Sequence, residues 1–427
     1  MLTIHYKNVI IFFALVIPLI NLFGQSPIVK RIDFIGYEKT KLYILEREIQ
    51  HPVDVPLDAA LAEADRLRLE NLGIFSMVNM QIISVSQNEV NVRYTVIENW
   101  RFFPMLSPLY DEKWGWSVGA TLMINNFRGR NESLVIRGQY GGQNTFGTTY
   151  YNPWITGDHV SIKIGAGNDV YDHTFLPYDV TYNHFQMAFG KYINNRLRTK
   201  AGLFVNEKTY SNETEKRKYL HITPYSTITF DSRDLYANPS RGIYSTNTIY
   251  VRFDTKGKAL NQLLWSHSTS KYHALIDGKW NTVLGLNIES RFTFGKNLDI
   301  WYDYIGGAYS VRGWKVPNNN LYESLEQSYR FGMNWITSSV EIRQTVVPKF
   351  ATKLGNELGL SMITFIDIGV LNNNISNLFQ KTPLIGTGVG IRIPWSVIGS
   401  IRLDYGWSFY KGNYVGQALH LAFGEKF

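Results

Sequence analysis

The 427-residue sequence contains no cysteine, so a small exported domain held together by disulfide bonds is excluded. After residue 24 it also lacks any apolar run close to the length of about 20 residues that a membrane-spanning helix needs. From Arg101 onward no long segment has helical periodicity, which excludes an all-α fold for that part of the chain.

The first 24 residues combine Lys7 with an apolar run from Val9 to Leu19, a pattern typical of a secretory signal peptide. Pro18 interrupts the run, and its length is short for a bilayer, so a retained anchor helix is the weaker interpretation. An exported chain without cysteine is expected in the periplasm or outer membrane of a bacterium with two membranes.

The net charge of +8 does not indicate nucleic-acid binding, because lysine and arginine are scattered singly at alternate positions of the predicted strands. A water-filled lumen or anionic lipid headgroups account for such a distribution. The 27 Tyr, 24 Phe and 11 Trp are typical of the aromatic girdles of membrane barrels.

Residues 28–99 form the only part with helical periodicity, and they predict a small α+β domain with a sheet on one side and helices on the other. On the second helix, the stripe Leu61, Ala64, Leu67 and Leu72 should face one way. The expected order is strand, helix, helix, strand, strand, over Val29–Gly36, Lys41–Gln50, Leu57–Leu72, Phe75–Ser84 and Val90–Glu98, with a turn at Gln87-Asn88.

Residues 101–427 predict a mainly β fold, an antiparallel transmembrane barrel of about 16 strands. Apolar Leu286 and Ile288 alternate with Asn287 and Glu289, a pattern that a soluble sandwich shares. No second domain is large enough to cover so much apolar surface, whereas closure satisfies every strand edge. Leu419, Leu421 and Phe423 alternate toward Phe427, as at the end of many outer-membrane barrels.

A Gly-rich loop from Tyr304 to Gly313 contains Arg312, which needs a carboxylate partner if the loop folds inward. Asp367 is the first candidate, because it shares a strand face with Phe365 and Gly369. Glu341 is the second, since Val340 and Ile342 would face lipid and place Glu341 and Arg343 inside the barrel. Arg312 could bridge both acids. An exposed arginine on an ordinary loop is the alternative.

Several motifs together resemble the outer-membrane assembly and translocation family that includes BamA, TamA and the two-partner secretion transporters. Residues 32–36 and 72–78 are similar to a POTRA module, and the barrel carries three further segments. These are the mid-barrel motif with Asp231, Arg233, Asp234, Pro239 and Gly242, the loop motif Val311-Arg312-Gly313-Trp314, and the strand motif Phe365 to Gly369. At the last position of the loop motif the family usually has Phe or Tyr instead of Trp.

The resemblance implies no cofactor and no covalent chemistry; members help other proteins fold into, or pass across, the outer membrane. Unfolded or exported client proteins, lipid and lipopolysaccharide, and accessory subunits in the periplasm or of the lipoprotein class are the expected partners. A two-partner secretion pore and a porin remain alternatives. A hydrolase is disfavoured, because the histidines are dispersed and no G-x-S-x-G or H-E-x-x-H motif occurs.

Two further sites are predicted. The POTRA strand with Met77, Asn79, Gln81 and Ile83 is the candidate edge for client binding by strand addition, although the domain could instead plug or support the barrel. The seam between the first and last strands should pair weakly because of Pro104, Pro108, Gly416 and Gly424, with Phe427 at its end, unless the prolines belong to the linker.

Overall fold

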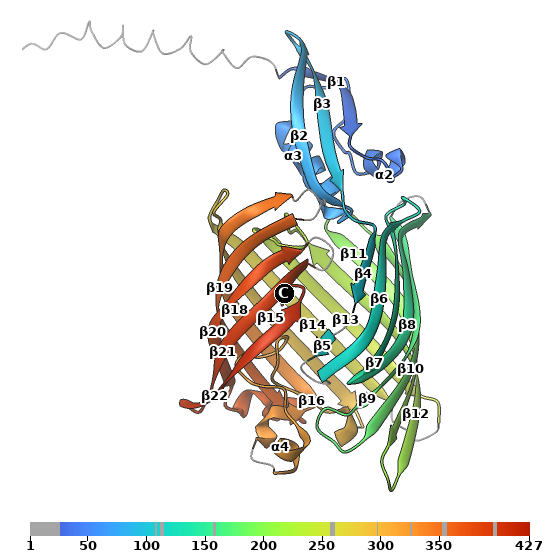
Figure 1. The fold of residues 1–427 in the computed structure, drawn as a ribbon, viewed down its shortest axis with the longest axis vertical. Helices are drawn as coiled ribbons and strands as arrows, with labels where there is room; N and C mark the ends of the chain where they lie inside the picture. Colours follow the sequence, from blue (N-terminus) through green and yellow to red (C-terminus); the bar gives the residue numbers. More distant parts are fainter. Residues whose placement is uncertain are drawn as a thin grey trace, which may run out of the picture.

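The computed structural model describes residues 26–106, 109–111, 115–156, 159–256, 261–296, 298–324, 327–351, 357–395 and 399–427. A small α+β domain stands on one end of a β-barrel (Figure 1). The predicted signal peptide lies outside the described residues. Among the residues that are described, no helix combines the length and apolarity needed to cross a membrane.

The small domain has the predicted element order, which is confirmed. Its sheet has the order β1-β3-β2, with β1 parallel and β2 antiparallel to the central strand. Helix α3 begins where Asp58 accepts a hydrogen bond from the Leu61 amide, and the first helix is shorter than predicted. The elements are β1 (Ile28–Ile35), α2 (Leu42–Glu46), α3 (Ala59–Asn71), β2 (Phe75–Ser86) and β3 (Glu89–Glu98).

Three residues of the predicted stripe of α3, Ala64, Leu67 and Leu72, share one side, but that side is directed toward the barrel. Against its own domain the helix buries Ala62, Asp65 and Leu69. Asp65 can lie there because its carboxylate accepts the backbone N–H groups of residues 50 and 51 at 2.9 and 3.0 Å. The predicted apolar residues Ala64, Leu67 and Leu72 line a cavity toward the barrel, so α3 packs on two sides and its pattern cannot be read as one stripe.

The barrel is an antiparallel sheet of 17 strand segments in closed order. Because β4 and β5 both pair with β6, they form one interrupted first strand, and the barrel has 16 strand positions. The segments are β4 (Phe102–Leu106), β5 (Leu109–Asp111), β6 (Gly115–Phe127), β7 (Glu132–Gly141), β8 (Gln143–Thr156), β9 (Val160–Asp172), β10 (Asp179–Tyr192), β11 (Leu197–Ser211), β12 (Lys216–Asp231), β13 (Gly242–Asp254), β14 (Gln262–Ile276), β15 (Thr282–Gly295), β18 (Asn334–Ala351), β19 (Glu357–Asn372), β20 (Leu384–Trp395), β21 (Gly399–Tyr410) and β22 (Asn413–Phe423).

The barrel has an apolar exterior and a polar interior. On β19, Ile366 and Ile368 are 49% and 42% exposed on the outside, whereas Asp367 is fully buried inside. Leu286 and Ile288 on β15 also face outward, with Asn287 buried between them. This inside-out distribution defines a transmembrane barrel of the outer-membrane type.

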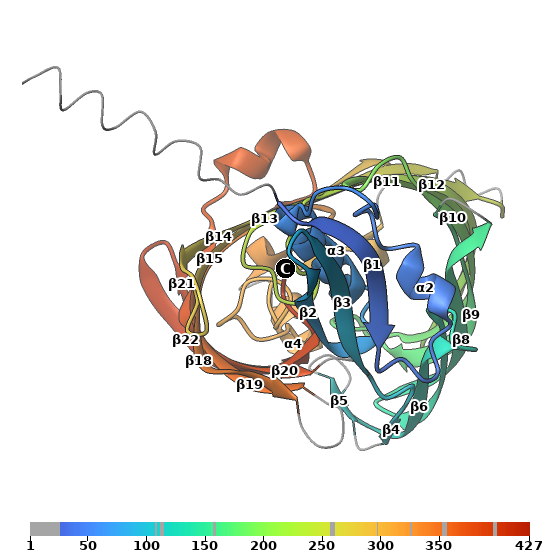
Figure 2. The same ribbon diagram turned by 90° about the horizontal axis from the view of Figure 1, so that it is seen from above.

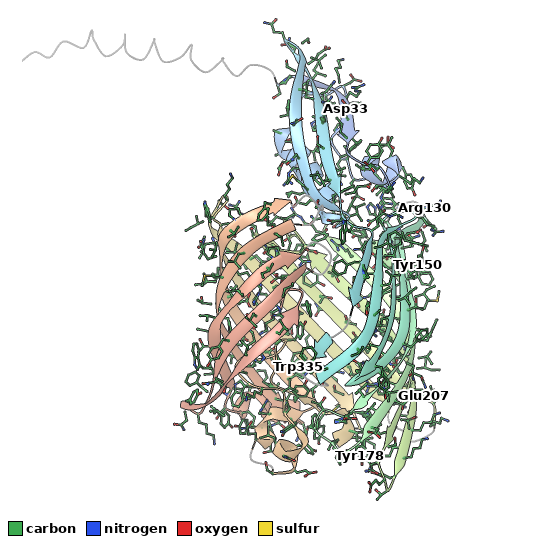
Figure 3. The ribbon with its side chains drawn as sticks, viewed as in Figure 1. Asp33, Arg130, Tyr150, Tyr178, Glu207 and Trp335 are labelled. Carbon is green, nitrogen blue, oxygen red and sulfur yellow. The ribbon has the colours of Figure 1, made fainter. Side chains whose placement is uncertain are left out.

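The small domain is hydrogen-bonded to the rim of the barrel and lies over one half of its opening (Figure 2). The Asn71 amide on α3 donates to the Asp234 carbonyl oxygen at 3.0 Å and accepts from the Tyr236 amide at 2.9 Å. On the other side, Asn126 donates to the Thr40 hydroxyl at 2.8 Å. Figure 3 places Arg130 at this near end of the barrel and Tyr178 at the far end.

Candidate functional site

The loop after β15, the eleventh strand position, folds back into the lumen. It contains η2 (Asp299–Trp301), β16 (Asp303–Tyr304), α4 (Asn319–Glu323), η3 (Ser328–Arg330) and β17 (Phe331–Gly332), and its two short strands pair with each other. Ile305, Val311 and Trp314 are buried in one apolar cluster with Leu371 and Leu384 of the barrel wall. This cluster gives the inward conformation a core of its own.

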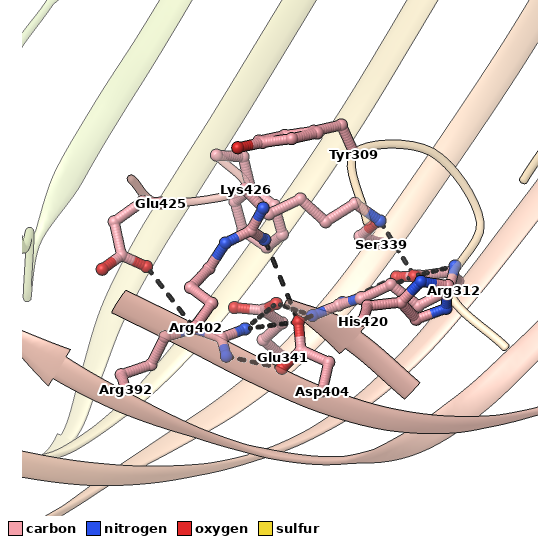
Figure 4. Close-up of polar contacts among 12 residues, drawn as sticks. Tyr309, Arg312, Ser339, Glu341, Arg392, Arg402, Asp404, His420, Glu425 and Lys426 are labelled. Carbon is pink, nitrogen blue, oxygen red and sulfur yellow. Dashed lines mark hydrogen bonds and ion pairs between the residues drawn. The ribbon is translucent and has the colours of Figure 1, made fainter. Parts of the chain in front are cut away.

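Arg312 is fully buried and contacts both acids predicted from the sequence, Asp367 and Glu341; Figure 4 labels Arg312 and Glu341. Its Nε and Nη2 donate to the two oxygens of Asp367 at 2.8 and 2.9 Å, a bidentate pair, and its backbone N–H also donates to Asp367 at 2.9 Å. Its Nη1 donates to Glu341 at 2.6 Å. The guanidinium carbon lies 3.7 Å from the ring centroid of Phe365, so the ring of this motif residue makes a cation–π contact with Arg312.

Further charged residues complete the arrangement. Strand alternation predicted Arg343 inside the barrel beside Glu341, whereas sequence reasoning missed Asp404, Arg392 and Lys426. Asp404 on β21 lies 3.5 Å from Arg312 Nη1 and accepts from both terminal nitrogens of Arg392. Arg343 Nε donates to the second oxygen of Glu341 at 2.8 Å. With Lys426, described below, we call this set the latch cluster: Arg312, Glu341, Arg343, Asp367, Arg392, Asp404 and Lys426.

The rest of the loop motif fixes the backbone against the wall. Gly313 has a φ of +89°, and its N–H donates to His420 Nε2 at 3.0 Å. Trp314 donates from its indole N–H to the Ile385 carbonyl oxygen at 3.0 Å, a bond that Phe in this position cannot make.

Glycines in the wall leave space for the loop. A Cβ at Gly386 would lie 1.8 Å from the Arg312 carbonyl oxygen, and one at Gly369 would lie 2.7 Å from a Val311 methyl carbon. The glycine that ends the Phe365 to Gly369 motif is therefore explained by close approach of the loop.

The end of the chain departs from the prediction. The terminal strand stops at Phe423, and Gly424, with a φ of +77°, turns the last residues into the lumen. Lys426 Nζ lies 2.9 Å from Asp367 Oδ2, while Phe427 stacks on Tyr272 with 6.3 Å between ring centroids. The expected outward alternation to Phe427 was wrong, because these inward contacts end the strand pattern four residues earlier.

Arg402 contrasts with Arg312, since it is equally buried but poorly paired. Its three guanidinium nitrogens make no hydrogen bond to the described residues. Its Nη1 lies 3.9 Å from an Asp404 carboxylate oxygen, and its guanidinium carbon lies 4.7 Å from the Tyr309 ring centroid.

The mid-barrel motif forms the turn between β12 and β13 at the near end. Arg233 makes a bidentate pair with Asp231 at 2.9 Å, and Asp234 accepts the backbone N–H groups of residues 235, 240 and 241. Pro239 is buried, and a Cβ at Gly242 would lie 2.3 Å from a backbone oxygen. The turn presents the Asp234 carbonyl oxygen to Asn71, so this motif anchors the small domain.

At the predicted seam, Pro104 lies inside β4, opposite Leu122 of β6, and thus in the first strand rather than in the linker. Pro108 falls outside the described residues. Gly416 lies within β22 and Gly424 directly after it. In the closed strand order β22 lies next to β4, so the first and last strands meet at this seam.

The predicted client edge is an edge of the sheet. Within the described residues β2 pairs only with β3, and Asn79 and Gln81 are exposed while Met77 and Ile83 are partly exposed. The opposite edge is different, because Val29 of β1 exchanges backbone hydrogen bonds with Asp54 and Val55.

Comparison with known proteins agrees with this architecture. A model of the Omp85 superfamily domain matches residues 126–427, and a POTRA model, described as a surface antigen variable number repeat, matches residues 27–99. Since the first match covers more than half of the chain, the protein belongs to the Omp85 superfamily, as an outer-membrane barrel with one POTRA domain in the periplasm. The resemblance inferred from the motifs is confirmed.

Among curated proteins, the chain is 24% identical over 157 residues to the outer membrane protein assembly factor BamA of Neisseria meningitidis serogroup B, which covers 36% of this chain and 19% of BamA. The matched stretch is thus about a fifth of that relative. Among solved structures, BamA from Haemophilus ducreyi lacking POTRA domains 1–3 has a TM-score of 0.54 at 17% identity, covering 93% of this chain and 84% of the other. CdiB from Escherichia coli has a TM-score of 0.54 at 11% identity, covering 94% and 90%. At these identities the likeness shows the fold.

Proposed function

We propose that this protein helps other proteins insert into, or cross, the outer membrane by noncovalent contacts alone. The observation that carries the proposal is the open β2 edge of a POTRA domain that is hydrogen-bonded to the barrel rim. An unfolded client could add a strand to this edge directly above the barrel opening. Lipid and lipopolysaccharide around the barrel, and accessory subunits on the POTRA domain, are the other partners we propose.

The β2 edge suits strand addition better than the β1 edge, because segment 54–55 already occupies β1. Ile82 and Val85 on β2 are 46% and 55% exposed and supply apolar contacts beside the free backbone groups. Binding through the backbone would make the affinity largely independent of client sequence.

Proline substitutions at Gln81 and at Ile82 test this edge. Neighbouring residues of a strand direct their N–H groups to opposite edges, so one of the two prolines removes only an outward donor and the other breaks the pairing with β3. We expect the outward variant to keep the thermal stability of the POTRA domain and to lose crosslinking to an unfolded client at least tenfold. Unchanged crosslinking in that variant would mean that the edge is not used.

We propose that the inward loop and the seam act together when a client passes. The Tyr309 hydroxyl of the loop donates to the Phe423 carbonyl oxygen at the end of β22, at 2.7 Å. Loop position and the state of the last strand are therefore mechanically linked. Opening between β22 and β4 would let a client strand enter the membrane from the lumen.

A disulfide clamp tests the seam, and the absence of native cysteine removes background oxidation. Cysteine pairs scanned around Phe103 and Leu421 should crosslink. Oxidation should lower the client-insertion activity in proteoliposomes at least tenfold, and reduction should restore it. A matched pair across β20 and β21, at Ile391 and Leu403, which are opposite in register, is the control. Full activity of the oxidised seam clamp would refute lateral opening.

A pore that secretes one dedicated exoprotein is the second candidate, because BamA and CdiB match the fold at the same TM-score of 0.54. A simple porin is less well supported, since the loop and residues 424–427 occupy the lumen. Depleting the protein and comparing the outer-membrane proteome separates these candidates: assembly predicts loss of many barrel proteins, and dedicated secretion predicts loss of one exported protein.

A further inference from the structure

A second charged region of the lumen lies beyond the latch cluster, at the far end of the barrel. It is a cavity of about 390 Å³ between the wall of β9 to β15 and loop residues 300–304. We call it the outer cavity. Its lining, taken over the described residues, contains no residue of the latch cluster, although Tyr219 and Ile300 belong to the same apolar cluster as Val311 and Trp314.

The outer cavity has more positive than negative charge. Its lining contains three cations, Lys208, Arg252 and Arg291, and one carboxylate, Asp303. Asp303 pairs with Arg291 at 2.8 Å. Arg252 donates to the neutral Gln262 side chain at 2.6 Å, and Lys208 lies 4.7 Å from the Tyr182 ring centroid. Among the described residues, no carboxylate oxygen lies within 4.0 Å of the Lys208 or Arg252 nitrogens.

A buried imidazole adds an independent sign of a ligand. His221 is 6% exposed, lines the same cavity, and its Nε2 has no hydrogen-bond partner in the part of the chain that the structure describes. It lies one strand from Lys208, because it pairs with Asn206 in the β11–β12 ladder. Buried polar atoms are normally satisfied, so an unsatisfied one that lines a cavity indicates a missing partner.

An aromatic ring from the loop lines the cavity beside these groups. Trp301 packs edge-to-face with His221 and Tyr219, with 5.5 and 5.4 Å between ring centroids, and the Arg252 guanidinium carbon lies 5.7 Å from its ring centroid. The negative face of such rings attracts the polarised C–H groups of a sugar ring. The two cations without a carboxylate match the charge of a phosphate monoester, about −1.5 to −2 at pH 7.

We propose that the outer cavity binds a phosphorylated sugar, with Lys208, Arg252 and His221 on the phosphate and Trp301 against the sugar ring. This site is independent of client handling. The ligand would enter from the far end of the barrel, which faces the cell exterior. A soluble sugar phosphate and a phosphorylated sugar of lipopolysaccharide carry the same recognised chemistry.

Calorimetric titration of the full chain in detergent tests the site with three probes: glucose 6-phosphate, glucose and inorganic phosphate. We expect glucose 6-phosphate to bind at least tenfold more tightly than either of the others. Lys208→Gln and Arg252→Gln should each weaken its binding at least tenfold. Trp301→Leu should reduce the preference for glucose 6-phosphate over inorganic phosphate to less than threefold.

Lys200→Gln is the matched control. Lys200 is on the same strand and face as Lys208 and also lies against a tyrosine ring, but it lines a different cavity toward the near end. Its substitution should change the affinity less than twofold. Equal weakening by Lys200→Gln and Lys208→Gln would overturn the proposal in favour of diffuse lumenal charge, as would the absence of glucose 6-phosphate binding to the folded wild-type protein.

The source of the ligand can then be determined in vesicles. The protein is reconstituted with intact or enzymatically dephosphorylated lipopolysaccharide, and glucose 6-phosphate binding is measured again. Occlusion of the site by intact lipopolysaccharide alone supports the proposal with a lipid-borne sugar. Unchanged binding in both vesicles supports it with a soluble ligand.

Discussion

The latch cluster and the outer cavity share one lumen but differ in how their cations are paired. In the latch cluster, Arg312 and Lys426 each lie within 3 Å of a carboxylate oxygen. In the outer cavity, Lys208 and Arg252 have no carboxylate within 4.0 Å among the described residues, although they lie on strands of the same barrel.

The difference shows that charge in this lumen serves two purposes. A buried ion pair with full hydrogen bonding holds one conformation, since breaking it leaves a charge without a partner. Unpaired cations around a cavity do not fix a conformation; they raise the local concentration of anions. The loop is therefore held by the ion pairs of the latch cluster, and it also forms part of the wall of the outer cavity.

The largest effect is expected from Arg312→Met, which leaves Asp367 and Glu341 buried with less compensation. Removing one partner of a buried pair costs about 3–5 kcal/mol. We expect a corresponding loss in the free energy of unfolding measured with urea in lipid vesicles, together with protease cleavage of the loop between residues 305 and 333. Client insertion should fall with it.

Arg402→Met is the matched control, because Arg402 is equally buried but makes no hydrogen bond to the described residues. Replacing such a group by an apolar side chain should change stability by less than about 1 kcal/mol or increase it. If both variants lose the same free energy of unfolding, the stability of the latch cluster depends on burial of the arginine and not on its ion pairs.

A smaller effect is expected from Lys426→Met, since Asp367 keeps its bidentate partner Arg312. A hydrogen bond to a charged group contributes about 1.5–3 kcal/mol, and the loss should lie in that range. The neighbouring Glu425→Gln is the control, because its contact with Arg392 is longer, at 3.8 Å. An effect of Lys426→Met no larger than that of Glu425→Gln would show that Lys426 does not stabilise the latch cluster.

The Arg312 contacts could be predicted from the sequence because strand alternation assigns each residue to one face. On β18 and β19 that rule directs Glu341 and Asp367 inward. The same rule applies to Asp404, which lies between Leu403 and Tyr405, but no motif drew attention to it. Alternation was the available signal.

The chain end and the outer cavity could not be predicted in this way. Gly424 ends the alternation, so the inward position of Lys426 depends on a turn and on partners from distant strands. The outer cavity depends on the stagger of several neighbouring strands, which brings Lys208 and Arg252 to the same level. Neither alternation nor local spacing contains that information. The packing of α3 on both its own sheet and the barrel rim was missed for a similar reason.

The smallest stability effect is expected from Lys208→Met, and it separates the two regions most directly. Because no carboxylate pairs with Lys208, an apolar side chain of similar length removes an uncompensated charge and breaks no ion pair. We expect the free energy of unfolding, measured without added ligand as for Arg312→Met, to stay within about 0.5 kcal/mol or to rise. A loss comparable to that of Arg312→Met would show that Lys208 stabilises the fold, and its charge would then have a structural role instead of one in ligand binding.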